Sequence, residues 1–103
     1  LGVELICHDT IEECLPELDV LYVTRLQRER FPDPVAFDNY ASTYRITPEL
    51  LEAAKPNMIV LHPLPRVDEI DPRVDTLPCA KYFDQAHNGV PVRMAMLNEV
   101  MKQ

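Results

Sequence analysis

Apolar positions along the chain gather in short runs that are separated by polar or proline-bearing segments. Three of these runs, residues 3–7, 20–23 and 58–61, have the length and the branched or aromatic side chains that favour buried strands. The run at 58–61 does not alternate with polar residues, which is typical of a central strand in a parallel sheet. Helical patterns lie between the runs. Together they predict an α/β fold with a parallel, Rossmann-like sheet flanked by helices.

Polar signals place the helices. Thr10 opens a capping box and predicts a short helix that ends near Pro16. Thr47 is a second cap, and Pro48 suits the first helical position, so a helix is expected from there to about residue 55. Residues 24–46 are polar, contain prolines and show little clean periodicity. We expect a long functional or mobile loop in that segment.

The carboxyl-terminal segment, residues 80–103, is predicted to be a helical segment that follows the α/β portion at residues 1–79. One face of this helix is apolar and needs a partner surface; it carries Met94, Leu97, Val100 and Met101. Pro91 lies inside the pattern, and an interior proline costs roughly 3 kcal/mol in a helix. The sequence therefore predicts a kink or a restart near Gly89.

Two segments that directly follow predicted strands carry candidate binding groups. After residues 20–23, Arg25 offers a planar fork suited to a carboxylate, and Gln27 adds a donor and an acceptor. After residues 58–61, the two prolines of residues 63–65 stiffen a turn and leave carbonyls without chain partners. Ligands of open α/β sheets bind beyond the carboxyl ends of strands. A solvated charged face and a rigid connector are the corresponding alternatives without function.

Longer motifs around these segments resemble the transcarbamoylase family, and within it the aspartate-binding domain of aspartate transcarbamoylases. The resemblance is carried by Val-Leu-Tyr-Val-Thr-Arg-Leu-Gln-Arg-Glu-Arg at 20–30, His-Pro-Leu-Pro-Arg-Val-Asp-Glu-Ile at 62–70, Val74-Asp75, and Tyr-Phe-Asp-Gln-Ala-His-Asn-Gly at 82–89. It implies that Arg25 and Gln27 bind L-aspartate. It also implies that backbone groups of Pro63, Leu64 and Pro65 bind carbamoyl phosphate. Ornithine transcarbamoylases carry cysteine in the equivalent turn, so Pro63 favours aspartate.

The reaction implied by the resemblance is attack of the α-amine of L-aspartate on carbamoyl phosphate, early in pyrimidine biosynthesis. The products are N-carbamoyl-L-aspartate and phosphate, and the complete chain is expected to form a homotrimer. The family's Ser-Thr-Arg-Thr-Arg phosphate motif does not occur in this sequence, and we assign no catalytic residue within it. We therefore expect part of a longer polypeptide, inactive alone, whose terminal helix packs on a missing domain. Ornithine transcarbamoylase and a noncatalytic assembly or ligand-sensing module are the alternatives.

Net charge and cysteine content indicate which partners and which cell compartment are expected. The net charge of −7 argues against nucleic acid and anionic membranes, because both require a basic surface. No apolar run approaches the roughly 20 residues that a membrane span needs. Cys7, Cys14 and Cys79 are odd in number and show no C-x-x-C pairing, which favours reduced thiols in a cytoplasmic protein.

One of the three histidines is a further candidate at the proline turn that follows residues 58–61. His8, His62 and His87 lack metal-ligand spacing, so neither a metal nor another cofactor is expected. His62 directly precedes the proline turn, where its ring can either meet the ligand or hold the turn by a structural hydrogen bond. The second interpretation is the favoured one.

Overall fold

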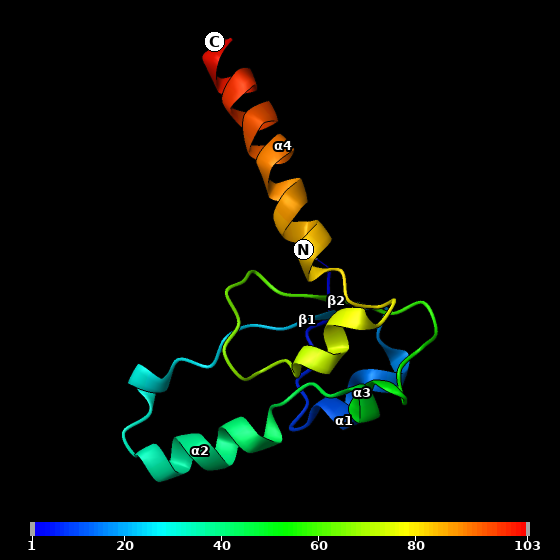
Figure 1. Cartoon of the computed structure of the whole chain (residues 1–103), viewed down its shortest axis with the longest axis vertical. Helices are drawn as coiled ribbons and strands as arrows, with labels where there is room; N and C mark the ends of the chain where they lie inside the picture. The colour runs from blue at the N-terminus through cyan, green and yellow to red at the C-terminus, as the bar shows by residue number, and fades with distance from the viewer. Residues whose placement is uncertain (1, 103) are drawn as a thin grey trace.

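The computed structural model describes residues 2–102 and shows a small parallel sheet with helices around it (Figure 1). In chain order the elements are α1 (Ile11–Cys14), the 3₁₀ helix η1 (Leu15–Glu17), β1 (Val20–Tyr22), the 3₁₀ helix η2 (Arg28–Arg30), α2 (Pro34–Thr43), α3 (Pro48–Leu51), β2 (Ile59–Leu61), the 3₁₀ helix η3 (Pro72–Thr76) and α4 (Tyr82–Met101). The predicted α/β class with a parallel sheet is confirmed.

Strand β2 makes backbone hydrogen bonds on both of its sides. It pairs in parallel with β1, with Leu21 opposite Val60. On its other edge the Val60 N–H donates to the Cys79 carbonyl at 2.8 Å, and the Lys81 N–H donates to the Val60 carbonyl at 3.0 Å. Both edges of β2 are therefore occupied, as its uninterrupted apolar run predicts.

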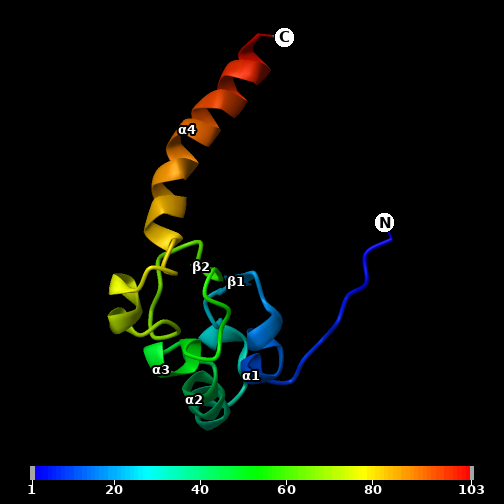
Figure 2. The same cartoon turned by 90° about the vertical axis from the view of Figure 1, so that its right-hand side faces the viewer.

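The prediction of a strand at residues 3–7 is wrong. These residues have no regular structure and extend away from the body of the molecule (Figure 2). Val3, Leu5 and Ile6 are 85%, 89% and 65% exposed. β-Propensity describes how well a side chain fits a half-buried pleated surface, and it forms no strand without a neighbour to pair with. Within residues 2–102 the sheet consequently has two strands.

The prediction of a long loop at residues 24–46 is wrong in its second half, where α2 forms a ten-residue helix. Asp33 caps it by accepting from the Val35 N–H at 3.0 Å, and Pro34 occupies the first turn. No residue of α2 is fully buried, although Phe37 and Ala41 are half-buried and Phe31 packs against Phe37 with ring centroids 5.2 Å apart. The apolar face of α2 is therefore short and only partly covered, and the prolines and polar residues around it hide its helical spacing.

The two short helices begin where the sequence places them. Thr10 is the residue before α1, and Thr47 caps α3 by accepting from the Leu50 N–H at 3.2 Å. The end of α3 differs from the prediction, because the helix stops at Leu51 rather than near residue 55. Turns continue from there toward Met58 and β2.

Helix α4 runs for 20 residues without interruption, so the predicted restart near Gly89 is wrong. Pro91 lies inside the helix and removes only the single N–H that would donate to the carbonyl four residues earlier, at His87. His87 is exposed, so water can solvate that carbonyl. No helix within residues 2–102 is both long and apolar enough to cross a membrane.

The core surrounds the sheet and the first turn of α4. Its buried apolar members are Leu15, Val23, Ile46, Leu51, Met58, Val60, Ile70, Val74 and Tyr82. The radius of gyration is 16.6 Å, against about 13 Å for a compact domain of 100 residues. Both views show the reason, since α4 projects from the body and Figure 2 shows the N-terminal segment doing the same.

Candidate functional site

The two candidate segments leave the sheet side by side. Tyr22 and Leu61 are paired at the ends of β1 and β2, and the Val23 N–H donates to the Leu61 carbonyl at 2.9 Å. Because the strands are parallel, the chain after Tyr22 and the chain after Leu61 emerge at the same edge. The structure therefore brings together the two segments that the sequence nominated separately.

A buried histidine organises the turn after β2. The His62 ring is 1% exposed; its Nδ1 lies 2.8 Å from the Leu64 N, and its Nε2 lies 2.7 Å from Glu69 Oε1. The other carboxylate oxygen of Glu69 accepts from the Val67 N–H at 3.1 Å. Burial acts to raise the pKa of Glu69, but backbone N–H groups and His62 outweigh it and leave that pKa below its ordinary value. The structural role favoured for His62 is confirmed.

Gln85 of α4 connects this turn to the neighbouring strand. Its Oε1 accepts from the His62 N–H at 2.9 Å, and its Nε2 donates to the Tyr22 hydroxyl at 3.2 Å. The first turn of α4 is thereby attached to the ends of both strands. Sequence reasoning did not select Gln85, because nothing local marks a glutamine whose partner lies 63 residues away.

A second cluster holds the far end of the turn. Arg66 donates both guanidinium nitrogens to the Asp75 carboxylate, one of them at 2.6 Å, and Tyr82 donates its hydroxyl to the same carboxylate. Arg66 holds the pKa of Asp75 below its usual range. Burial, followed by the hydrogen bond to Asp75, raises the pKa of Tyr82 to about 12. These bonds attach the turn to η3 and to α4.

The segment after β1 is more exposed. The Arg25 side chain is 49% exposed, and its Nη2 donates to Glu29 Oε1 at 3.3 Å. Gln27 is half-buried at the residue before η2. Arg25 lines a cavity of about 260 Å³ together with Asp68 and Glu69, which follow the proline turn. An arginine held by one exposed contact remains available for a carboxylate ligand.

Pro63 lines a different cavity, of about 280 Å³, with Tyr22, His62, Gln85 and Arg93 among its walls. Pro63 and Arg25 thus line two different hollows rather than one closed pocket. Arg93 comes from α4, where it lies against the glycine at position 89: a Cβ built there would be 2.9 Å from Arg93 Nη1.

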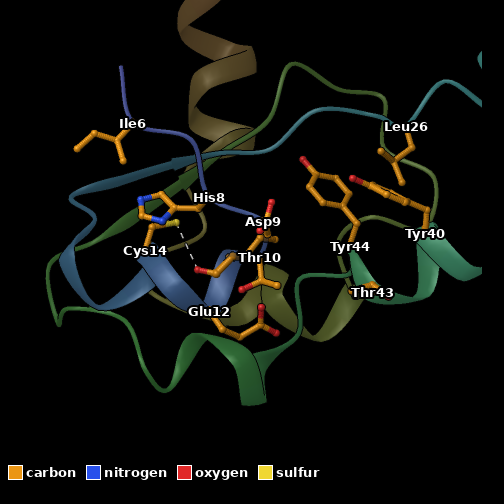
Figure 3. A pocket seen from close by; sticks show the side chains of 11 residues that line it. Ile6, His8, Asp9, Thr10, Glu12, Cys14, Leu26, Tyr40, Thr43 and Tyr44 are labelled. Carbon is orange, nitrogen blue, oxygen red and sulfur yellow. Dashed lines mark hydrogen bonds between the residues drawn. The ribbon is translucent and has the colours of Figure 1, made fainter. Parts of the chain in front are cut away.

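A larger cavity, of about 610 Å³, lies away from these groups (Figure 3). Figure 3 shows His8 and Cys14 on one side and the rings of Tyr40 and Tyr44 on the other, with Leu26 above them. None of the predicted site residues lines it. One wall is the extended N-terminal segment, so its volume reflects that this segment stands off from α2. Across residues 2–102, no group of three His, Cys, Asp or Glu side chains is arranged to hold a metal ion.

Comparison with known proteins supports the resemblance over nearly the whole chain. The family model described as aspartate/ornithine carbamoyltransferase, Asp/Orn binding domain, matches residues 2–100. Over 101 residues the chain is 87% identical to the aspartate carbamoyltransferase catalytic subunit of Methanocorpusculum labreanum and 67% identical to that of Methanosphaerula palustris. These matches take in 98% of this chain but 33% and 34% of the relatives. The chain therefore spans about a third of the length of the curated relatives it matches.

Solved structures agree. The catalytic subunit of M. jannaschii aspartate transcarbamoylase matches 91% of this chain, with a TM-score of 0.83 and 48% identity, over 30% of that protein's chain. Aspartate transcarbamoylase from Trypanosoma cruzi in complex with carbamoyl phosphate matches 84%, with a TM-score of 0.74 and 45% identity, over 27% of its chain. With the family match at residues 2–100, the chain belongs to the aspartate/ornithine carbamoyltransferase family, in its Asp/Orn-binding domain.

Proposed function

We propose that the protein carrying this chain is an aspartate carbamoyltransferase and that this chain binds L-aspartate. The observation that carries the proposal is the 87% identity to a relative named aspartate carbamoyltransferase catalytic subunit. Pro63 agrees, because the ornithine enzymes carry cysteine in the equivalent turn. The reaction joins the α-amine of L-aspartate to the carbamoyl carbon of carbamoyl phosphate and releases phosphate.

In this proposal the two segments divide the substrates between them. Arg25 and Gln27 bind L-aspartate, with the guanidinium of Arg25 exchanging Glu29 for the substrate's side-chain carboxylate. Such an exchange is inexpensive, because an exposed pair four residues apart contributes only about 0.3–0.5 kcal/mol. The carbonyls of the proline turn accept hydrogen bonds from the amide of carbamoyl phosphate. The acceleration comes from positioning and fixed dipoles, and the reaction requires no covalent intermediate on the enzyme.

The proposal extends to assembly and cell context. The complete polypeptide forms a cytoplasmic homotrimer that acts in pyrimidine biosynthesis. Residues 1–79 belong to the aspartate-binding unit, and the helix of residues 80–103 packs on the part that holds carbamoyl phosphate. The exposed apolar side chains of α4 support such packing; Met94 is 64%, Leu97 65% and Val100 68% exposed.

The test is a carbamoylation assay on the natural polypeptide that carries this sequence, at its full encoded length. Labelled carbamoyl phosphate is supplied with L-aspartate or with L-ornithine. Conversion of L-aspartate supports the proposal, and preferential conversion of L-ornithine favours the sister enzyme. Binding of either amino acid without turnover favours the noncatalytic module.

A further inference from the structure

The hydrogen bonds around His62 determine which nitrogen of its ring carries the proton. The Leu64 backbone N–H is only a donor, so His62 Nδ1, 2.8 Å away, must be an acceptor. A ring that accepts at Nδ1 carries its proton at Nε2, and this proton is donated to Glu69 Oε1 at 2.7 Å. Imidazolium would place a second donor against the Leu64 N–H. The arrangement therefore requires neutral His62 beside ionised Glu69.

This bond also fixes the direction of a carbonyl. The Leu64 N–H and the Pro63 C=O belong to one planar peptide unit, and in its trans form the two groups point in opposite directions. Because the N–H points to the buried His62 ring, the Pro63 carbonyl points away from that ring. Leu64 itself has a φ of +52°, a conformation that a leucine rarely adopts without support from its surroundings.

The ring is held from its other side as well. Glu69 keeps His62 Nε2 in place, and Gln85 holds the His62 backbone by accepting its N–H at 2.9 Å. The Leu64 peptide is thus oriented by a histidine whose ring and backbone are both restrained. Such restraint is what a hydrogen-bond acceptor needs if it is to meet a ligand without reorganising.

We propose that His62 is a positioning residue for carbamoyl transfer, because its ring Nδ1 orients the Leu64 peptide and so aims the Pro63 carbonyl at the amide of carbamoyl phosphate. This inference rests on the proposed function. It assigns to His62 no contact with the substrate. The ring then has two separate roles, since Nδ1 orients the turn by accepting from Leu64 while the Nε2–H donates to the buried carboxylate of Glu69.

Two substitutions separate these roles in the full-length natural polypeptide. His62→Gln retains an amide N–H near the Nε2 position for Glu69 but removes the acceptor from Leu64. His62→Asn retains an oxygen near the Nδ1 position for Leu64 but releases Glu69. His87→Gln, at an exposed histidine of α4, is the matched control.

The decisive readout is the ratio of two affinities, for carbamoyl phosphate and for inorganic phosphate, which lacks the amide. We expect His62→Gln to weaken the binding of carbamoyl phosphate about tenfold, while the affinity for inorganic phosphate changes less than about twofold. His62→Asn should retain the wild-type ratio although its melting temperature falls. A ratio that is unchanged in His62→Gln, or lowered equally in both variants, overturns the proposal.

The protonation of the His62 ring and the activity of the wild-type protein are measured as well. The ¹⁵N spectrum of the wild-type imidazole should show a protonated Nε2 and a bare Nδ1; the opposite tautomer or an imidazolium overturns the inference even if the variants do not fold. Wild-type protein that fails to carbamoylate L-aspartate contradicts the proposed function. Active wild-type protein with an unaltered ratio in His62→Gln contradicts this inference alone.

Discussion

The loops that follow β1 and β2 leave the same edge of the sheet and are held in opposite ways. After β2, the turn is fixed from inside by His62 and Glu69, both less than 10% exposed. After β1, Arg25 is half-exposed and meets Glu29, four residues along the same loop. One loop is preorganised by contacts with distant parts of the chain, whereas the other retains a side chain that can change partners.

The difference matches what the two proposed substrates require. Backbone carbonyls cannot rotate toward a ligand independently, so their direction must be set in advance by the fold. A guanidinium on a long side chain can move to a carboxylate as it arrives, provided that its resting partner is weak. The rigid loop is therefore the one whose proposed binding groups are backbone atoms, and the freer loop is the one whose proposed binding groups are side-chain atoms.

The largest expected effect comes from deleting one glutamate in each loop. Glu69→Ala leaves the His62 Nε2–H and the Val67 N–H without partners and should lower the free energy of unfolding by roughly 3–5 kcal/mol. Glu29→Ala should lower it by less than about 0.5 kcal/mol, because it removes only an exposed pair. Urea denaturation of both variants measures the contrast. Equal losses would abolish the distinction between the loops.

An alkaline titration sharpens the comparison on the rigid side. Tyr82 has an ordinary pKa of 10.0 that the fold raises to about 12, so the folded state holds this proton more tightly than the unfolded state. Its contribution is fully present below pH 10 and is lost as the pH rises through about 12. The free energy of unfolding should fall with a slope approaching about 1.4 kcal/mol per pH unit. Denaturant unfolding at a series of pH values measures it.

Two tyrosine variants isolate that slope. Tyr82→Phe should remove it, at the cost of the hydroxyl's bond to Asp75 at neutral pH. Tyr40→Phe, at a ring that is 60% exposed, should retain it. A slope that survives in Tyr82→Phe would assign the alkaline limit to another group.

The smallest effect on the fold, and a selective one on function, is expected at Arg25. Arg25→Ala in the full-length polypeptide should raise the KM for L-aspartate roughly 10- to 100-fold, the range expected for a lost charge-assisted contact. Carbamoyl phosphate binding and the melting temperature should hardly change. Arg45→Ala removes another exposed arginine, paired with Asp71, and serves as control for steady-state kinetics with both substrates. Unchanged aspartate kinetics in Arg25→Ala would remove Arg25 from the site.

Local sequence signals predicted the elements that have local causes. Thr10 and Thr47 marked two helix starts, although only Thr47 makes the side-chain capping hydrogen bond, and the apolar run before His62 identified strand β2. The strand at residues 3–7 failed, because a strand also needs an edge to pair with, and no sequence pattern shows whether that edge is present. Helix α2 was missed because its apolar positions, such as Phe37 and Ala41, are few and only half-buried, and because prolines at 32 and 34 suggested a loop.

The site followed the same rule. The stiff proline turn was visible in the sequence, and the role of His62 as its support was within reach because its Leu64 partner lies two residues away. The contributions of Gln85 and Tyr82 could not be predicted in this way. Their partners, Tyr22 and Arg66, become their neighbours only when α4 packs against the sheet. Contacts of that kind depend on topology, which patterns of propensity do not encode.

The proline inside α4 places a requirement on whatever covers that helix. Around it lies an apolar surface, with Val90, Val92 and Met94 all more than half exposed, but the missing N–H of Pro91 leaves the His87 carbonyl without its helical donor. A partner surface that is apolar throughout would remove water from that oxygen. The unsatisfied acceptor would then weaken the binding free energy by about 1–3 kcal/mol. A partner with a hydrogen-bond donor at that one spot avoids the penalty. The backbone at this one position would therefore favour a partner surface that offers a hydrogen-bond donor over one that is apolar throughout.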